Sequence, residues 1–143
     1  MAGYSGRALA HKLGIKPGTT IAILGGPRGY RATLGPLPEK SRVTRALRPG
    51  LALVQYFTKS RGELATRFPA LARSLAPDGA LWVSWPKGSS GVRTDLTENV
   101  VREIGLAAGL VDVKVCAVDQ TWSGLKFVRR LRDRPDGGYS GGR

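Results

Sequence analysis

Residues 80–85, with the sequence ALWVSW, form a short and almost wholly apolar segment with a helical pattern on each side. Before this segment, apolar residues recur at helical spacing from Leu64 to Leu75, and residues 77–79 (PDG) suggest a turn. After it, a second helical repeat runs from Leu96 to Ala108. A strand with a crossover helix on each side is the repeating unit of a parallel α/β sheet. Residues 75–98 therefore predict an α/β fold with a mainly parallel sheet.

Other segments extend this sheet in both directions. Residues 20–24 have the uniformly apolar look of a buried parallel strand, and residues 51–57 predict a second buried strand. Residues 111–118 and 125–129 alternate between apolar and polar and predict an antiparallel hairpin. Prolines punctuate residues 30–49, which leaves room for one or two helical turns and a short strand near 42–46. We expect one three-layer, Rossmann-like domain over residues 1–131 and a disordered tail over 132–143.

Two helix starts carry the spacing of a capping box, in which a side chain accepts a hydrogen bond from a free backbone N–H. Ser60 stands three residues before Glu63 and predicts a helix that begins there. Asp95 stands three residues before Glu98, so the next helix is expected to begin near Thr94 or Asp95.

Positive charge is concentrated in the first third of the chain. The sequence has 23 Lys and Arg against 10 Asp and Glu, a net charge of +13 that attracts polyanions. Residues 1–50 hold a single acid, Glu39, and nine bases: Arg7, Lys12, Lys16, Arg28, Arg31, Lys40, Arg42, Arg45 and Arg48. The partner suggested by this balance is a phosphate-bearing small molecule or a nucleic acid. The alternative is that the cations only solvate the surface.

The sequence shows no membrane segment and no set of metal ligands. No apolar run approaches the roughly 20 residues of a membrane span, and the first residues lack a signal-peptide core. We therefore expect a cytoplasmic protein without a membrane partner. One cysteine, Cys116, and one histidine, His11, provide neither a zinc site nor a nucleophile with its base, so no catalytic or metal-binding residue is assigned.

The polar loop after the strand at 80–85 is the main candidate site, because ligands bind open parallel sheets at the carboxyl ends of their strands. Its hydroxyls, cations and flexible backbone suit a phosphate or a carboxylate. The alternative is a loop that only caps the next helix. The candidate anion-binding residues are Trp85, Lys87, Ser89, Ser90, Arg93, Thr94 and Asp95.

The order of strands and helices resembles the class I methyltransferase variant of the Rossmann fold, with a shortened amino-terminal half. More closely, residues 4–130 resemble a small bacterial family of uncharacterised function that is common in actinobacteria. The motifs that carry this resemblance are YSG at 4–6, KLGI at 12–15, WPK at 85–87, TDLT at 94–97, VCAVD at 115–119 and TWSGL at 121–125.

The methyltransferase resemblance implies S-adenosylmethionine, held by a glycine-rich turn after the first strand and an acid at the end of the second. The matching turn residues here are Gly25, Gly26, Arg28 and Gly29. Pro27 removes one N–H from that turn, no long helix follows it, and residues 42–47 offer Arg45 in place of an acid. We therefore expect no cofactor, with S-adenosylmethionine as the alternative.

Trp122, between the hairpin strands, is a large aromatic in a turn, where it either covers the sheet edge or contacts a partner. The exposed edge of the hairpin permits a dimer. The function predicted from the sequence is a binding or regulatory module for an anionic ligand, without catalysis. A divergent S-adenosylmethionine-dependent methyltransferase and a basic nucleic-acid-binding protein are the alternatives.

Overall fold

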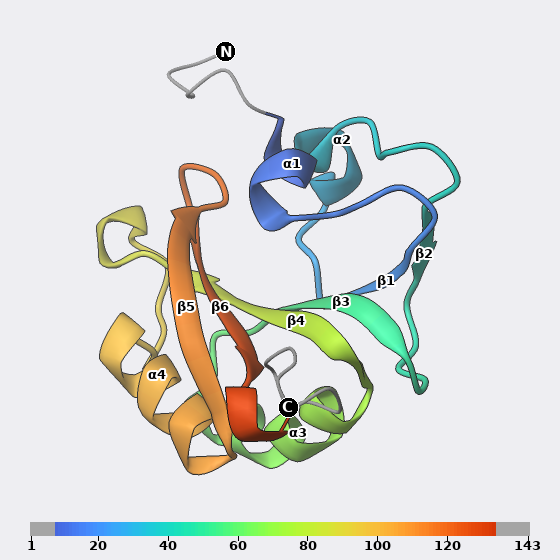
Figure 1. Cartoon of the computed structure of the whole chain (residues 1–143). Helices are drawn as coiled ribbons and strands as arrows, with labels where there is room; N and C mark the ends of the chain where they lie inside the picture. The colour runs from blue at the N-terminus through green and yellow to red at the C-terminus, as the bar shows by residue number, and fades with distance from the viewer. Residues whose placement is uncertain (1–7, 134–143) are drawn as a thin grey trace.

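The computed structural model describes residues 8–133 and contains one six-stranded sheet between two pairs of helices (Figure 1). The elements in chain order are α1 (Leu9–Leu13), β1 (Thr20–Leu24), α2 (Tyr30–Leu34), β2 (Arg42–Thr44), β3 (Leu51–Phe57), α3 (Arg61–Arg73), β4 (Leu75–Pro86), the 3-10 turn η1 (Gly88–Ser90), α4 (Glu98–Ala107), β5 (Leu110–Ala117), β6 (Trp122–Arg129) and the 3-10 turn η2 (Leu131–Asp133).

The sheet order is β2-β1-β3-β4-β6-β5. The first four of these strands run parallel, whereas β6 is antiparallel to both β4 and β5. This arrangement confirms the Rossmann-like α/β fold with a carboxyl-terminal antiparallel hairpin. Residues 4–6 of the predicted family motif and residues 134–143 of the predicted tail lie outside the described residues.

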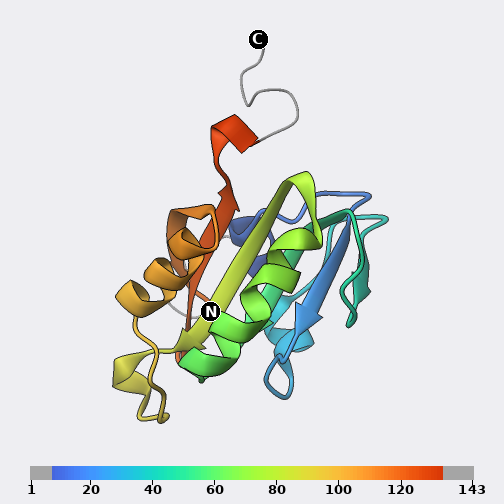
Figure 2. The ribbon, with the colours of Figure 1, turned by 90° about the horizontal axis from the view of Figure 1, so that it is seen from below.

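Each face of the sheet has its own apolar core. On one face, α3 and α4 contribute Leu64, Phe68 and Val101 to a cluster with the sheet. On the other face, α1 and α2 contribute Leu13 and Tyr30. Figures 1 and 2 show the two helix pairs on opposite sides of the sheet.

The central strand β4 joins both cores. Its residues from Gly79 to Pro86 are all buried. Trp82 belongs to the cluster under α1 and α2, and Trp85 to the cluster under α3 and α4, as expected for residues of odd separation on a strand. The Trp82 indole N–H donates to the Leu13 carbonyl oxygen at 2.9 Å, which attaches the end of α1 to the sheet.

Two local predictions are corrected. The turn expected at residues 77–79 is an irregularity within β4, because Leu51 pairs with Leu75 while Leu53 pairs with Ala80. Between these two pairs, four residues of β4 lie opposite one residue of β3. The exposed Pro77 and Asp78 are two of those four residues.

The start of α4 also differs from the prediction. Its N-cap is Thr97, whose hydroxyl accepts from the Val100 N–H at 3.2 Å, whereas Thr94 and Asp95 lie before the helix. At α3 the predicted cap is confirmed, since the Ser60 hydroxyl accepts from the Glu63 N–H at 3.0 Å. The Glu63 carboxylate does not return to Ser60, and accepts from the Thr58 hydroxyl at 2.6 Å instead.

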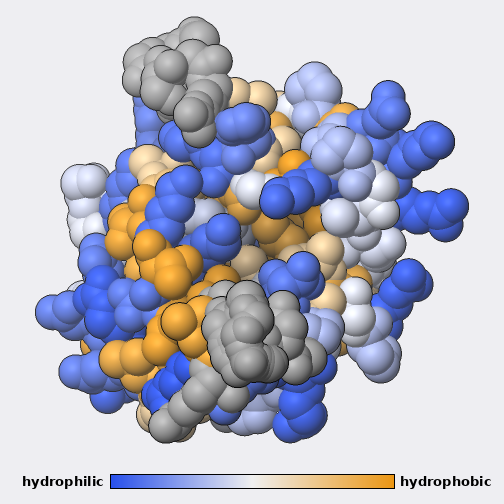
Figure 3. Space-filling model, viewed as in Figure 1, coloured by the Kyte–Doolittle hydropathy of each residue, from blue (hydrophilic) through white to orange (hydrophobic). Residues whose placement is uncertain are grey.

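The edge strand β5 presents apolar side chains to solvent. Val113 is 54% exposed and Val115 is 47% exposed, and Figure 3 shows hydrophobic surface gathered over this part of the molecule. Among residues 8–133, no helix is long and apolar enough to cross a membrane.

The two long helices, α3 and α4, each contain a glycine, and substituting it tests how closely the helix packs on its neighbours. A Cβ added at Gly105 would lie 2.0 Å from Cε1 of Phe127, a buried core ring, whereas one at Gly62 would meet only the Ser60 hydroxyl at 3.9 Å. We expect Gly105→Ala to lower the free energy of unfolding by about 3 kcal/mol through overpacking. Gly62→Ala should raise it by about 0.5 kcal/mol because alanine restricts the unfolded chain.

Urea unfolding of both variants, followed by circular dichroism, measures this difference. Equal small effects of the two substitutions would contradict the close contact between α4 and β6.

Candidate functional site

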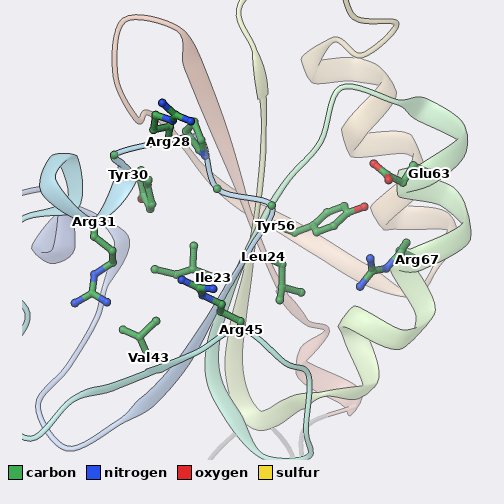
Figure 4. Close-up of a pocket in the computed structure, with 14 residues that line it drawn as sticks. Ile23, Leu24, Arg28, Tyr30, Arg31, Val43, Arg45, Tyr56, Glu63 and Arg67 are labelled. Atoms are coloured by element: carbon green, nitrogen blue, oxygen red, sulfur yellow. The ribbon is translucent and has the colours of Figure 1, made fainter.

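A cleft of about 700 Å³ lies at the carboxyl ends of β1, β2 and β3 (Figure 4). Its volume is in the range of small-molecule sites. It extends from the turn after β1 and the helix α2 across the sheet ends to the first turns of α3. The lining residues are Ile23, Leu24, Gly25, Gly26, Pro27, Arg28, Gly29, Tyr30, Arg31, Val43, Arg45, Tyr56, Glu63 and Arg67.

The glycine turn after β1 forms one wall of this cleft. Gly25 has φ +70°, and a Cβ there would lie 2.7 Å from the Phe57 carbonyl oxygen, so only glycine lets this turn pass so close to the end of β3. Gly29 has φ +78° at the start of α2. The structure thus brings the four predicted turn residues, Gly25, Gly26, Arg28 and Gly29, into one cleft lining.

A buried chain of polar side chains holds this wall against the sheet. The Tyr30 hydroxyl donates to Gln55 Oε1 at 2.6 Å, and Gln55 Nε2 donates to the Ser84 hydroxyl at 3.3 Å. Burial raises the pKa of the Tyr30 phenol well above its usual range, so the hydroxyl keeps its proton at neutral pH. The sequence analysis missed this chain, although Gln55 within an apolar strand was a visible signal.

Tyr56 lies at the opposite end of the cleft, between β3 and α3 (Figure 4). Its ring is buried, and the Arg67 guanidinium carbon lies 5.4 Å from the ring centroid. Within residues 8–133 the Tyr56 hydroxyl forms no hydrogen bond of acceptable geometry, although the Thr58 hydroxyl and the Glu63 carboxylate, which bond to each other, lie near it. Burial raises the pKa of the Tyr56 phenol, and the negative charge of Glu63 raises it further, so this hydroxyl also remains protonated.

Charge in the cleft is strongly unbalanced. Four arginines line it and the only lining carboxylate is Glu63. At the end of β2, where the methyltransferase resemblance implies an acid, Arg45 is present.

The predicted anion loop does not line this cleft. Instead, several of its polar side chains form hydrogen bonds with backbone groups. The Thr94 hydroxyl donates to the Lys59 carbonyl oxygen at 2.7 Å, and Asp95 accepts from the Arg61 N–H at 2.7 Å, which ties the loop to the start of α3. The Ser90 hydroxyl donates to the Lys87 carbonyl oxygen at 2.7 Å.

The remaining members of the predicted loop site lie in different environments. Trp85 is 5% exposed within the core under α3 and α4. Lys87 is partly buried, whereas Ser89 and Arg93 are exposed. Ligand binding by this loop stays a prediction.

Trp122 is the first residue of β6 rather than part of a turn. It is partly buried, pairs with Pro86, and packs edge to face on Phe57 with ring centroids 5.1 Å apart. Its ring therefore packs against the end of β3, and a contact of Trp122 with a partner stays a prediction. In residues 8–133 no group of three His, Cys, Asp or Glu side chains is placed to hold a metal ion.

Solved structures of several methyltransferases share this fold. The chain superposes on a S-adenosylmethionine-dependent methyltransferase from Aquifex aeolicus with a TM-score of 0.63 and 15% identity, covering 82% of this chain and 85% of that one. Magnesium protoporphyrin IX methyltransferase from Synechocystis with bound S-adenosylhomocysteine gives a TM-score of 0.55, 15% identity, and coverage of 85% and 78%.

A third similar structure is 1,6-didemethyltoxoflavin-N1-methyltransferase from Burkholderia thailandensis, also with bound S-adenosylhomocysteine. Its TM-score is 0.58 at 16% identity, with coverage of 85% of this chain and 74% of that one. No protein-family model and no curated protein matches the chain. The molecule therefore has a class I methyltransferase-like Rossmann fold, and its origin in an actinobacterial family stays a prediction.

These neighbours correct the expectation that the chain works without a cofactor. That expectation depended on the missing acid and the short helix after the glycine turn. It is wrong in the light of neighbouring structures that share the fold over most of the chain and hold S-adenosylhomocysteine or S-adenosylmethionine.

Two tyrosines line the cleft, and replacing each with phenylalanine compares a hydroxyl that forms a hydrogen bond with one that does not. Tyr30→Phe removes a hydroxyl that bonds to Gln55 and should lower the free energy of unfolding by about 1–2 kcal/mol. Tyr56→Phe removes a buried hydroxyl without a partner and should raise it by about 1 kcal/mol. Urea unfolding at pH 7 gives both values. A loss of similar size in Tyr56→Phe would show that its hydroxyl is satisfied.

Proposed function

We propose that this chain is a divergent S-adenosylmethionine-dependent methyltransferase whose cofactor binds in the cleft at the ends of β1, β2 and β3. The observation that carries the proposal is the glycine turn after β1, which opens into that cleft in a fold shared with methyltransferases. The comparisons favour this alternative over a module without catalysis.

The cleft residues fit the cofactor in most respects. Gly25, Gly26 and Gly29 permit close approach to backbone, and Ile23 and Val43 offer apolar contact to an adenosyl group. The planar guanidinium group of an arginine can bind the carboxylate of the methionine part of S-adenosylmethionine through two hydrogen bonds. The departure is Arg45 at the place where the ribose hydroxyls are bound by an acid in the methyltransferases that the chain resembles.

When bound, S-adenosylmethionine supplies an electrophilic methyl group on its sulfonium. The protein residues then have three tasks: to orient the acceptor, to keep water out and to receive the acceptor proton. Glu63 is the only carboxylate in the cleft lining and is the group suited to take that proton. Tyr56 is suited to donate a hydrogen bond rather than to act as a base, because its pKa is raised.

Two glycine-to-alanine substitutions test the cofactor site. A Cβ at Gly26 would lie 3.4 Å from Ile23 Cγ2 and 3.6 Å from Tyr30 Cβ, so the free protein should accept it. Because this methyl group would occupy the wall of the cleft, we expect Gly26→Ala to weaken S-adenosylhomocysteine binding at least tenfold. Gly88→Ala, where a Cβ meets nothing within 4 Å and which lies outside the cleft lining, is the matched control.

Isothermal titration calorimetry with S-adenosylhomocysteine and S-adenosylmethionine measures both variants. Four arginines should favour the uncharged sulfur of the first ligand over the sulfonium of the second. No binding of either ligand at millimolar concentration would refute the proposed function.

A further inference from the structure

The four arginines of the cleft come from four separate elements. Arg28 belongs to the turn after β1, Arg31 to α2, Arg45 to the segment after β2 and Arg67 to α3. Figure 4 shows Arg28 and Arg31 on one side of the cleft, Arg67 on the other and Arg45 between them. The charge excess of the first third of the chain is thus gathered in part at one cavity.

None of these arginines is neutralised within the described residues. The ion pairs found there join Arg102 to Glu98 and to Asp112, far along the chain from the cleft. The one acid in the cleft lining, Glu63, accepts a hydrogen bond from the Thr58 hydroxyl and forms no ion pair with Arg67 one helical turn away. The four arginine cations repel one another, and the single Glu63 carboxylate does not balance their charge. The free cleft is therefore arranged to receive a negatively charged ligand.

The chemistry of the lining narrows the ligand further. All four cations are arginine, whose planar fork binds phosphate or carboxylate through two parallel hydrogen bonds. Between them lie apolar side chains of Ile23, Leu24 and Val43. A volume of about 700 Å³ suits a small molecule rather than the length of a nucleic-acid strand.

We infer that Arg45, which replaces the ribose-binding acid, does not contact the ribose and instead joins Arg67 in holding a small molecule that carries phosphate or carboxylate groups, and that this molecule is the methyl acceptor. The acceptor role rests on the proposed function, whereas the anion binding does not. S-adenosylmethionine carries a net positive charge at neutral pH, so it leaves the arginine excess of the cleft unmatched. An anionic acceptor would offset that excess and lie beside a cationic methyl donor.

Inorganic pyrophosphate serves as the probe, titrated by calorimetry into the full chain saturated with S-adenosylhomocysteine. We expect Arg45→Ala and Arg67→Ala each to weaken pyrophosphate binding at least tenfold. Arg48→Ala is the matched control, because Arg48 is exposed three residues beyond Arg45 and does not line the cleft. It should change the affinity less than twofold.

The outcomes separate the two proposals. Equal losses in Arg45→Ala and Arg48→Ala would mean general attraction to a basic surface, including a nucleic-acid surface, and would overturn the inference. Competition between pyrophosphate and S-adenosylhomocysteine would overturn the acceptor role, because one ligand would exclude the other. Arg45-dependent pyrophosphate binding in a chain that does not bind S-adenosylhomocysteine would overturn the proposed function and the acceptor role while leaving the anion site.

Discussion

Burial of β4 on both faces is the constraint on which the rest of the molecule depends. Trp82 packs toward α1 and α2, and Trp85 packs toward α3 and α4, so helices must cover both sides of the strand. The crossover through α3 makes β3 and β4 parallel, and β1 and β2 run in the same direction. Parallel strands end at one edge, and that edge is where the glycine turn, Arg45 and Tyr56 meet. The cleft is therefore a consequence of how the core is built.

The sequence predicted those parts of the fold whose burial is encoded locally. Residues 20–24 and 51–57 are almost wholly apolar because each strand is covered on both faces, and their bounds match β1 and β3. The start of α4 was predicted less well. Several hydroxyls and carboxylates precede that helix, and which of them caps it depends on contacts elsewhere: Asp95 bonds to Arg61 and Thr94 to Lys59, which leaves Thr97.

The site was predicted only in part for a similar reason. The turn residues Gly25 to Gly29 carry a recognisable local pattern, whereas Arg45 and Arg67 join them only through strand pairing and helix packing. The loop after β4 was placed at the correct edge of the sheet. The cleft, however, lies on the β1 side of that edge, and the loop's hydrogen bonds hold it against the start of α3. The position of a site along the sheet edge depends on the tertiary structure, and the spacing of residues in the sequence does not specify it.

The Tyr30, Gln55 and Ser84 chain has a consequence for folding fidelity. Leu53, Gln55 and Phe57 project to the same face of β3, so a slip of the strand by two residues would keep leucine and phenylalanine facing the same core. Hydrophobicity alone discriminates poorly against that misalignment. The slip would move Gln55 away from both Tyr30 and Ser84 and leave buried polar groups without partners, each at a cost of about 1–3 kcal/mol. One glutamine thus sets the alignment of the strand that carries Tyr56 to the cleft.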